Sequence, residues 1–263
     1  MIHLKSEEEI ELIKNSSLLV GKTLAEVANY LKPGVKTNYL DKIAEEYIRS
    51  NDAIPGFKHY RGYSATLCIS VNDQVVHGIP GNNEVVDGDI VSIDCGVVKN
   101  GYYGDSAYTF ALGEVKPEVL QLLRITKESL YKGIEMAVAG NRVGDISYTI
   151  QNFVEKHGYT IVRELVGHGI GKNLHEDPQV PNFGSRGSGV KLSEGLVICI
   201  EPMINLGKKE IVQERDGWTI RTRDSKPSAH FEHQVVVRKN QCEVLSTFEY
   251  IEKVKNNNIS VIF

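Results

Sequence analysis

Apolar residues recur along the first fifty positions at the three- and four-residue spacing of amphipathic helices. Ser6 and Glu9 have the spacing of a capping box, which predicts that a helix begins here, and Pro33-Gly34 ends it. A second helical pattern runs from about residue 37 to 51. The strand-like runs that follow span residues 66–71, 90–98 and 102–112.

The same order of elements recurs in the second half of the chain. Helical patterns span about residues 117–139 and 145–157, with Gly140 between them. Strand-like runs follow near residues 160–166, 196–200, 211–214 and 233–238. Segments 87–94 and 194–201 both read as acid, glycine, apolar run, acid, at an offset of 107. The pattern predicts an α+β fold built from two related halves.

This repeat also predicts the domain organisation. Its unit is longer than the periods of solenoid proteins and occurs only twice, which indicates a duplication. We therefore expect a single catalytic domain over residues 1–263, with halves of about 1–113 and 114–250 and a loose C-terminal tail at 254–263. A chain of 263 residues is long enough to bury a substantial core.

Each repeated segment ends in an acid, Asp94 in the first and Glu201 in the second. A carboxylate that closes an apolar run is costly to bury unless a cation meets it. Asn100-Gly101 predicts a two-residue hairpin turn, which places Asp105 opposite Gly96 and diagonal to Asp94. Diagonal neighbours lie roughly 7–8 Å apart, so both carboxylates can reach one ion. The alternative for Asp105 is an ordinary acid near a turn.

Two further candidate ligands lie in the second half. His168 stands between glycines at 167 and 169, which let the backbone approach closely whatever the imidazole binds. Glu232 comes just before the β-branched run at 235–237, although edge-strand charges of this kind are common. His77 and His175 are weaker candidates because a lone histidine is more often a packing or surface residue. His175 is not part of a zinc-binding H-E-x-x-H helix, since Pro178 interrupts that pattern.

Oxygen-rich sites with one imidazole suit divalent Mn, Fe, Co or Zn. Four acids and one histidine exceed the needs of one catalytic ion and fit a pair about 3.5–4 Å apart, as two-metal hydrolases use. The sequence contains no nucleophile elbow, no P-loop and no dinucleotide-binding fingerprint.

Composition narrows the picture further. The net charge is −4 and no basic run stands out, so nucleic acid is not favoured as a partner. The N-terminus has no apolar signal core, and the apolar runs are too short to span a membrane, so we expect a cytoplasmic protein. Four widely spaced cysteines argue against a disulfide framework or a thiolate zinc site, and Cys95 and Cys199 are expected to pack as small hydrophobes.

Nine short segments in order resemble the type I methionine aminopeptidases over nearly the whole chain. They are residues 68–73, 76–80, 88–94, 104–106, 167–171, 174–178, 200–203, 216–218 and 231–234. The resemblance implies the pita-bread fold, in which two α/β halves surround a central antiparallel sheet with pseudo-twofold symmetry. It implies a monomer that removes the N-terminal methionine from nascent proteins and peptides, at the ribosome or after release, with a small second residue favoured.

The same resemblance implies roles for individual residues. Five would hold two divalent ions (Co, Mn, Fe or Zn): Asp94 on one, His168 and Glu201 on the other, Asp105 and Glu232 bridging both. A hydroxide bridging the ions would attack the peptide. The catalytic residues would be His175 at the scissile carbonyl oxygen, His77 at the peptide nitrogen and Glu201 as proton shuttle. The methionine pocket would be lined by Tyr60, Tyr63, Cys68, Trp218, His77 and His175.

Two details complete the resemblance. Leu174 stands where the family often has a bulky aromatic residue, which predicts a differently shaped pocket wall. Asn72 and Ser228 match positions that coordinate a monovalent cation in some members. Helices that start within the first ten residues leave no zinc-finger extension, and the second half has no room for the helical insert of type II enzymes.

Three alternatives stay open from the sequence. A pita-bread protein without catalysis would serve as a binding module, but such relatives lack several of the ligands that this chain retains. A two-metal Xaa-Pro peptidase would carry a large additional N-terminal domain. A two-metal phosphoesterase would need basic residues near the site, and the motif segments bring only Lys172.

Overall fold

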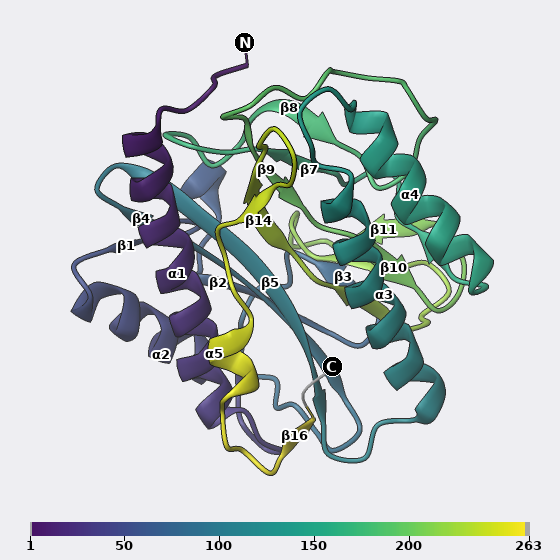
Figure 1. The fold of residues 1–263 in the computed structure, drawn as a ribbon. Helices are drawn as coiled ribbons and strands as arrows, with labels where there is room; N and C mark the ends of the chain where they lie inside the picture. Colours follow the sequence, from purple (N-terminus) through teal and green to yellow (C-terminus); the bar gives the residue numbers. More distant parts are fainter. Residues whose placement is uncertain (1, 261–263) are drawn as a thin grey trace.

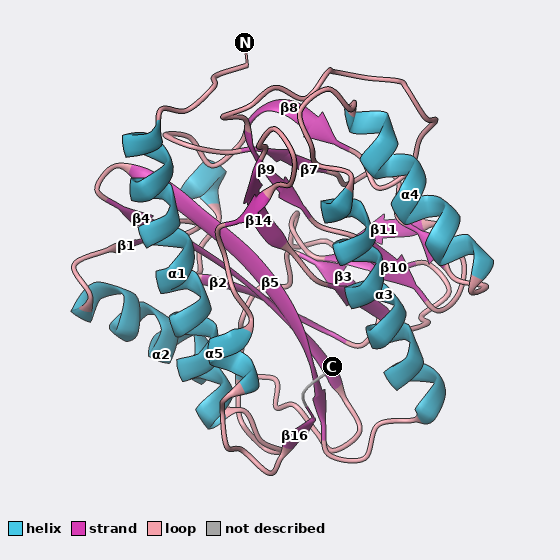
Figure 2. Cartoon of the chain, viewed as in Figure 1, coloured by secondary structure: helices cyan, strands magenta, loops and turns pink. Residues whose placement is uncertain are grey.

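The computed structural model describes residues 2–260 and combines long helices with small antiparallel sheets (Figure 2). The long helices are α1 (Glu7–Tyr30), α2 (Thr37–Ser50), α3 (Pro117–Glu135) and α4 (Val143–Lys156), and the short ones are η1 (Tyr60–Gly62) and α5 (Glu249–Glu252). Helix α1 begins at the predicted capping box: Ser6 Oγ accepts from the Glu9 N–H, and the Glu9 carboxylate accepts from the Ser6 N–H. The helices flank the strands on two sides (Figure 1).

The first half is built on a long hairpin. Its sheet contains β1 (Ile54–Pro55), β2 (Leu67–Val71), β4 (Ile90–Lys99), β5 (Tyr102–Leu112) and β16 (Ile259–Ser260). Asn100 and Gly101 have φ values of 53° and 79°, as a two-residue type I′ turn requires. The pairing Gly96↔Asp105 follows, so the predicted register is confirmed.

Shorter strands make up the second half. One sheet has the order β15 (Glu243–Val244), β14 (His233–Val236), β9 (Val197–Ile200), β7 (Gly167–Gly169), β8 (Glu176–Val180). A second contains β13 (Ser228–His230), β10 (Met203–Asn205) and β6 (Thr160–Ile161). A third joins β11 (Ile211–Gln213) and β12 (Ile220–Thr222) to β3 (Gln74–Val76) of the first half. Helix pairs followed by strands thus occur twice, as the repeat predicts.

The two halves meet where β5 runs beside residues 230–232. The Glu232 N–H donates to the Ala107 carbonyl at 3.0 Å, and Ser106 Oγ donates to the Glu232 carbonyl at 2.7 Å. Thr109 Oγ1 donates to the His230 carbonyl at 2.7 Å. These bonds bring acids that are far apart in sequence to one place. A continuous buried apolar core, with contributions from α1–α4, β4, β5 and β9, supports them.

Two predicted boundaries are wrong. Helix α3 ends at Glu135 rather than 139, because the Ala139 N–H donates to the Arg238 carbonyl and Val138 pairs with Arg238 instead of continuing the helix. The strand expected at 160–166 is only the two-residue β6, which pairs with the short strand β10. The strand predicted at 90–98 is confirmed as β4, but Asp94 lies in its middle, so the apolar run continues past this carboxylate to Val97 and does not end at it.

The C-terminal tail is packed, in contrast to the loose tail expected. Asn256 Nδ2 donates to the carbonyls of Ala28 and Leu31 at the end of α1, at 2.7 and 2.8 Å. Strand β16 then adds to the edge of β5, where Ile259 pairs with Leu112. A run of asparagines is typical of a solvated segment. Here, however, the side-chain amide of Asn256 donates to carbonyls that the end of α1 leaves without intrahelical partners. The last expected tail residues, 261–263, lie outside the described residues.

Within residues 2–260, no helix is both long enough and apolar enough to cross a bilayer.

Candidate metal centre and substrate pocket

Five side chains predicted as ligands converge in one cavity, and we call them the carboxylate cluster. They are Asp94 in β4, Asp105 in β5, His168 in β7, Glu201 directly after β9, and Glu232 between β13 and β14. His168 Nε2 lies 3.6 Å from Glu201 Oε1 and 3.9 Å from Asp105 Oδ2. Asp105, His168 and Glu232 are each less than a tenth exposed.

The carboxylate cluster lacks positive partners. Within residues 2–260, its carboxylates have ion-pair contacts only to histidines, and Asp94 Oδ1, Asp105 Oδ1 and Glu232 Oε1 are buried without a hydrogen-bond partner. Burial, and after it the neighbouring carboxylates, raises the pKa of Asp105 and Glu201 well above the usual range. Such unpaired buried acids are costly, and bound divalent cations would neutralise them. The residues present therefore fit a metal centre.

His168 is prepared to act as a ligand. Burial lowers its pKa to about 4, so the imidazole is neutral at pH 7, and Nδ1 lies 2.9 Å from the Gly169 carbonyl. The flanking glycines have a different purpose from the one expected. A Cβ at residue 167 or 169 would lie 2.3 Å from the Cys199 carbonyl oxygen or 2.2 Å from the Asp177 carbonyl oxygen. Neighbouring strands, rather than a ligand, need this space.

Two residues at the cluster were not predicted as site residues, and one of them, Cys199, was expected only to pack as a small hydrophobe. Cys199 offers its Sγ within 4.8 Å of ligand atoms of Asp105, His168 and Glu232. The sequence could have indicated Cys199, because it lies two residues before Glu201 and residues two apart in an extended chain point to the same side. His230 is 2% exposed, and its Nε2 lies 3.8 Å from Glu201 Oε2 without a hydrogen bond. His230 precedes Glu232 by two, so the same spacing could have flagged it.

An apolar and aromatic surface lines the rest of the cavity, and we call it the pocket wall. The name refers to seven of these lining residues: Tyr60, Tyr63, Cys68, His77, Leu174, His175 and Trp218. The rings of Tyr63 and Trp218 meet edge to face with centroids 5.0 Å apart. Cys68 is directly opposite Asp94 in the β2–β4 ladder, so the pocket wall adjoins the carboxylate cluster. All six residues predicted to line the pocket therefore lie in the cavity.

His175 belongs to a loop beside the carboxylate cluster, and its imidazole lines the cavity although the residue as a whole is exposed. Its ring centroid lies 4.4 Å from that of His168, and its Nδ1 is 2.7 Å from the Tyr60 hydroxyl. Burial of the ring nitrogens, and then the proximity of His168, lowers its pKa to about 3. The imidazole is therefore neutral near pH 7.

Comparison with known proteins decides the family. The model of metallopeptidase family M24 matches residues 11–239. The chain belongs to this family. It is 50% identical over 246 residues to a methionine aminopeptidase of Clostridium perfringens, covering 94% of this chain and 99% of the relative. A methionine aminopeptidase of Bacillus subtilis is 44% identical over 246 residues, again with 94% and 99% coverage.

Solved structures agree on the M24 fold. A methionine aminopeptidase from Rickettsia prowazekii superimposes with a TM-score of 0.93 at 38% identity, covering 94% of this chain and 100% of that one. An X-Pro aminopeptidase from Thermotoga maritima shares the fold at 22% identity and a TM-score of 0.75, and this chain spans 62% of its length. The expected pita-bread fold and the resemblance to type I methionine aminopeptidases are confirmed.

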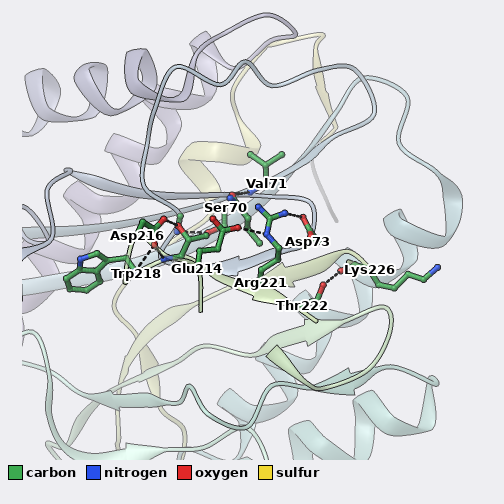
Figure 3. A network of polar contacts seen from close by, with 12 residues as sticks. Ser70, Val71, Asp73, Glu214, Asp216, Trp218, Arg221, Thr222 and Lys226 are labelled. Carbon is green, nitrogen blue, oxygen red and sulfur yellow. Dashed lines mark hydrogen bonds and ion pairs between the residues drawn. The ribbon is translucent and has the colours of Figure 1, made fainter. Parts of the chain in front are cut away.

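Trp218 owes its place in this M24 chain to the network in Figure 3. Asp216 Oδ1 accepts from the Trp218 N–H at 2.8 Å, at the tip of the β11–β12 hairpin. Arg221 on β12 then joins this hairpin to the β2–β3 turn, with 2.5 Å to Glu214 Oε1 and 2.6 Å to Asp73 Oδ1. His77 follows β3, so both aromatic groups depend on the same small sheet.

Asn72 and Ser228, the positions expected at a monovalent cation, lie side by side in the structure. The Ser228 N–H donates to the Asn72 carbonyl at 2.9 Å. The Asn72 side chain is already bonded to Asp89 and the Ile90 N–H, and Ser228 Oγ to Asn205. The monovalent cation stays a prediction.

Proposed function

We propose that this chain is a methionyl aminopeptidase, which hydrolyses the N-terminal methionine from proteins and peptides with a small second residue. One observation carries the proposal: the carboxylate cluster and an aromatic, sulfur-containing pocket wall share one cavity. Methionine aminopeptidases that cover nearly the whole chain at 44–50% identity support it. A thioether packs favourably against aromatic rings and sulfur, so Cys68, Tyr63 and Trp218 suit a methionine side chain.

Two divalent ions are proposed as the cofactor, with Co, Mn, Fe and Zn as the candidates. Asp94 would chelate one ion, His168 and Glu201 would hold the other, and Asp105 and Glu232 would bridge them. When bound, the metal supplies Lewis acidity and an activated water at neutral pH. The three unpartnered carboxylate oxygens support this assignment, because a bridging or chelating carboxylate uses both oxygens.

His175 is proposed to stabilise the oxyanion that develops on the scissile carbonyl. A neutral imidazole donates one hydrogen bond, and its direction depends on the tautomer. If the Tyr60 hydroxyl donates to Nδ1, the proton of His175 resides on Nε2, which can donate to the carbonyl oxygen. A preorganised donor of this kind typically contributes about 10²–10³ in kcat.

His77 and Glu201 are assigned the remaining proposed roles. Burial lowers the pKa of His77, so this histidine is a neutral partner for the peptide nitrogen. Glu201 lies within 3.6 Å of His168 and 3.8 Å of His230, and its carboxylate would carry the proton toward the leaving amine.

The same proposal extends to partners and place of action. Nascent polypeptide N-termini in the cytoplasm, including those at the ribosome, would be the substrates, and the protein would act as a monomer without nucleic-acid recognition of its own. Light scattering of the purified protein tests the monomer, and co-sedimentation with ribosomes tests the association.

An assay of three substrates tests the proposed activity. Protein purified without added metal is incubated with each candidate ion and with Met-Ala-Ser, an Xaa-Pro peptide or a phosphate ester. Release of free methionine from Met-Ala-Ser alone supports the proposal. Preference for the Xaa-Pro peptide or the ester would contradict it, and metal analysis of the same preparation identifies the ion.

A further inference from the structure

A buried ion pair links the start of the chain to the loop that carries His175. Lys5 Nζ lies 2.6 Å from Glu176 Oε2, and the two side chains are only 6% and 8% exposed. Lys5 Nζ also donates to the His3 carbonyl at 3.1 Å. Lys5 directly precedes Ser6, the N-cap of α1, so it is anchored to a long helix.

The surroundings of this pair leave little freedom. The Lys5 N–H donates to the Gly195 carbonyl at 2.8 Å, just before β9. A Cβ at Gly171 would lie 2.5 Å from Lys5 Cε and 2.9 Å from Glu176 Oε1, so a larger residue there would push the ends of these two side chains out of their present positions. In Figure 1 the N-terminal segment lies at the same end of the molecule as β8.

Glu176 in turn orders the loop from within. Its Oε1 accepts from the Asn173 N–H at 3.1 Å while Oε2 accepts from Lys5. The loop is further held by the Tyr103 N–H, which donates to the Gly171 carbonyl at 2.8 Å. His175 is the neighbour of Glu176 and projects into the cavity from this loop. Within the described part of the chain, the imidazole itself has one hydrogen bond, to Tyr60.

We infer that Lys5 is a positioning residue: through Glu176 it fixes the backbone of the 171–175 loop and so the imidazole of His175. This inference rests on the proposed function, in which His175 faces the scissile carbonyl. Functional side chains must be held within about 0.5 Å of the productive geometry, and loops achieve this only with supporting contacts. Losing Lys5 leaves the Glu176 carboxylate buried with a single N–H partner, which favours rearrangement of the loop.

Substitution of Lys5 by Met tests the inference because it keeps the length of the side chain and removes its charge. We expect kcat for Met-Ala-Ser to fall about 10- to 100-fold. The KM and the bound divalent metal should stay near wild-type values, because neither the pocket wall nor the carboxylate cluster is touched. Glu176→Gln leaves one neutral acceptor oxygen where the carboxylate has two, so it can keep only one of the contacts to Asn173 N–H and Lys5 Nζ, and it should give a smaller loss. It also covers the case in which Lys5→Met folds poorly.

Lys172→Met is the matched control. Lys172 belongs to the same loop, but its side chain is 67% exposed and lies 3.7 Å from Glu9. Its loss should change kcat less than about twofold, as is usual for exposed ion pairs. A loss in this variant equal to that of Lys5→Met would overturn the inference.

A second substitution separates positioning from general stability. In a His175→Ala background, Lys5→Met should have little further effect, because Lys5 acts through the imidazole that is already absent. Equal losses in both backgrounds, or a loss of metal in Lys5→Met, would mean a merely structural role. Hydrogen exchange should also speed up at the amides of residues 171 and 173 in Lys5→Met, and unchanged exchange there would contradict the inference.

The activity of the wild-type protein distinguishes a failure of the proposed function from a failure of the inference about Lys5. If metal-loaded wild type does not release methionine, the proposed function fails and the inference with it. If wild type is active and Lys5→Met has the same kcat, only the inference fails.

Discussion

The carboxylate cluster and the pocket wall lie in the same cavity but are built in opposite ways. The cluster presents buried oxygens without partners on or beside strands, such as Asp105 and Glu232. The pocket wall places its key groups, His175 and Trp218, in loops that are held by paired charges, Lys5 with Glu176 and Arg221 with Asp73. One region is electrostatically unsatisfied in the protein alone, and the other is satisfied.

Because of this difference, the two regions contribute to the stability of the fold with opposite signs, although both are proposed to serve the reaction. Unpaired buried acids lower the stability of the metal-free fold, so the rigid strands around them must compensate. The ion pairs that support the pocket wall stabilise the fold. They also fix the positions of His175 and Trp218, which the loops alone would hold less firmly. Substitutions should therefore have opposite effects on stability in the two regions, even where both reduce activity.

The largest effect is expected for Asp105→Asn in the carboxylate cluster. Losing a carboxylate that is proposed to bridge the two ions should remove metal and reduce kcat/KM by more than about 10³-fold. The metal-free variant should also melt at a higher temperature than metal-free wild type, because burying Asp105 costs free energy whether the carboxyl is ionised or is forced to hold a proton. Metal analysis, kinetics and calorimetry measure the three quantities. A variant that retains full metal content, or melts lower when metal-free, would argue against an unsatisfied cluster.

His175→Ala should give the next largest effect. We expect kcat to fall about 10²- to 10³-fold, the usual cost of an oxyanion donor, while the metal content is unchanged. Steady-state kinetics together with metal analysis distinguishes this from a ligand role. If metal is lost in proportion to activity, His175 belongs with the cluster instead.

Arg221→Met should affect binding more than chemistry. With its links to Asp73 and Glu214 removed, the β11–β12 hairpin holds Trp218 less firmly, so KM should rise about 3- to 10-fold with kcat nearly unchanged. Arg223→Met is the matched control, since Arg223 is an exposed arginine two residues further along the same hairpin. Equal kinetics for the two variants would show that Arg221 does not support the pocket wall.

The smallest effect concerns pH. Burial raises the pKa of Asp105, Glu201 and Glu232 well above the usual carboxyl range, so as the pH rises above that range the metal-free folded protein keeps protons that the unfolded chain has released. Stability therefore falls as pH rises, by about 1.4 kcal/mol per retained proton and pH unit, or roughly 3–5 °C in Tm. The cluster histidines have lowered pKa values in the folded protein, so a comparison at pH 7 and above avoids most of their titration in both states.

Calorimetry of chelator-treated protein at pH 7 and 8 measures this slope. Metal-loaded protein is the control, because bound cations hold the carboxylates ionised and should abolish the decrease. A metal-free Tm that stays constant or rises over this interval would contradict the raised pKa values.

The carboxylate cluster was more predictable from the sequence than the pocket wall. A two-residue turn at Asn100-Gly101 fixes the register of a long hairpin, so the diagonal placement of Asp94 and Asp105 follows from local rules. Regular periodicity likewise predicted α1 and α2. The roles of His175 and Trp218 came from resemblance, because loop conformation depends on contacts that span up to 171 positions, as for Lys5 and Glu176.

The errors share a cause. Helix α3 stops early because the residues after it pair with Arg238 rather than continue the helical hydrogen bonds. Strand β6 is short because it pairs only with the short strand β10. The tail was read as loose from its asparagines, yet Asn256 caps α1 from 225–228 positions away. Tertiary hydrogen bonds of this kind leave no periodic signal in the sequence.

Anomalous diffraction from crystals grown with Mn²⁺ or Co²⁺ tests the central claim most directly. We predict two peaks about 3.5–4 Å apart, each within coordination distance of the carboxylate cluster. Peaks only at other sites, or a cluster that binds no cation at saturating metal, would contradict the account.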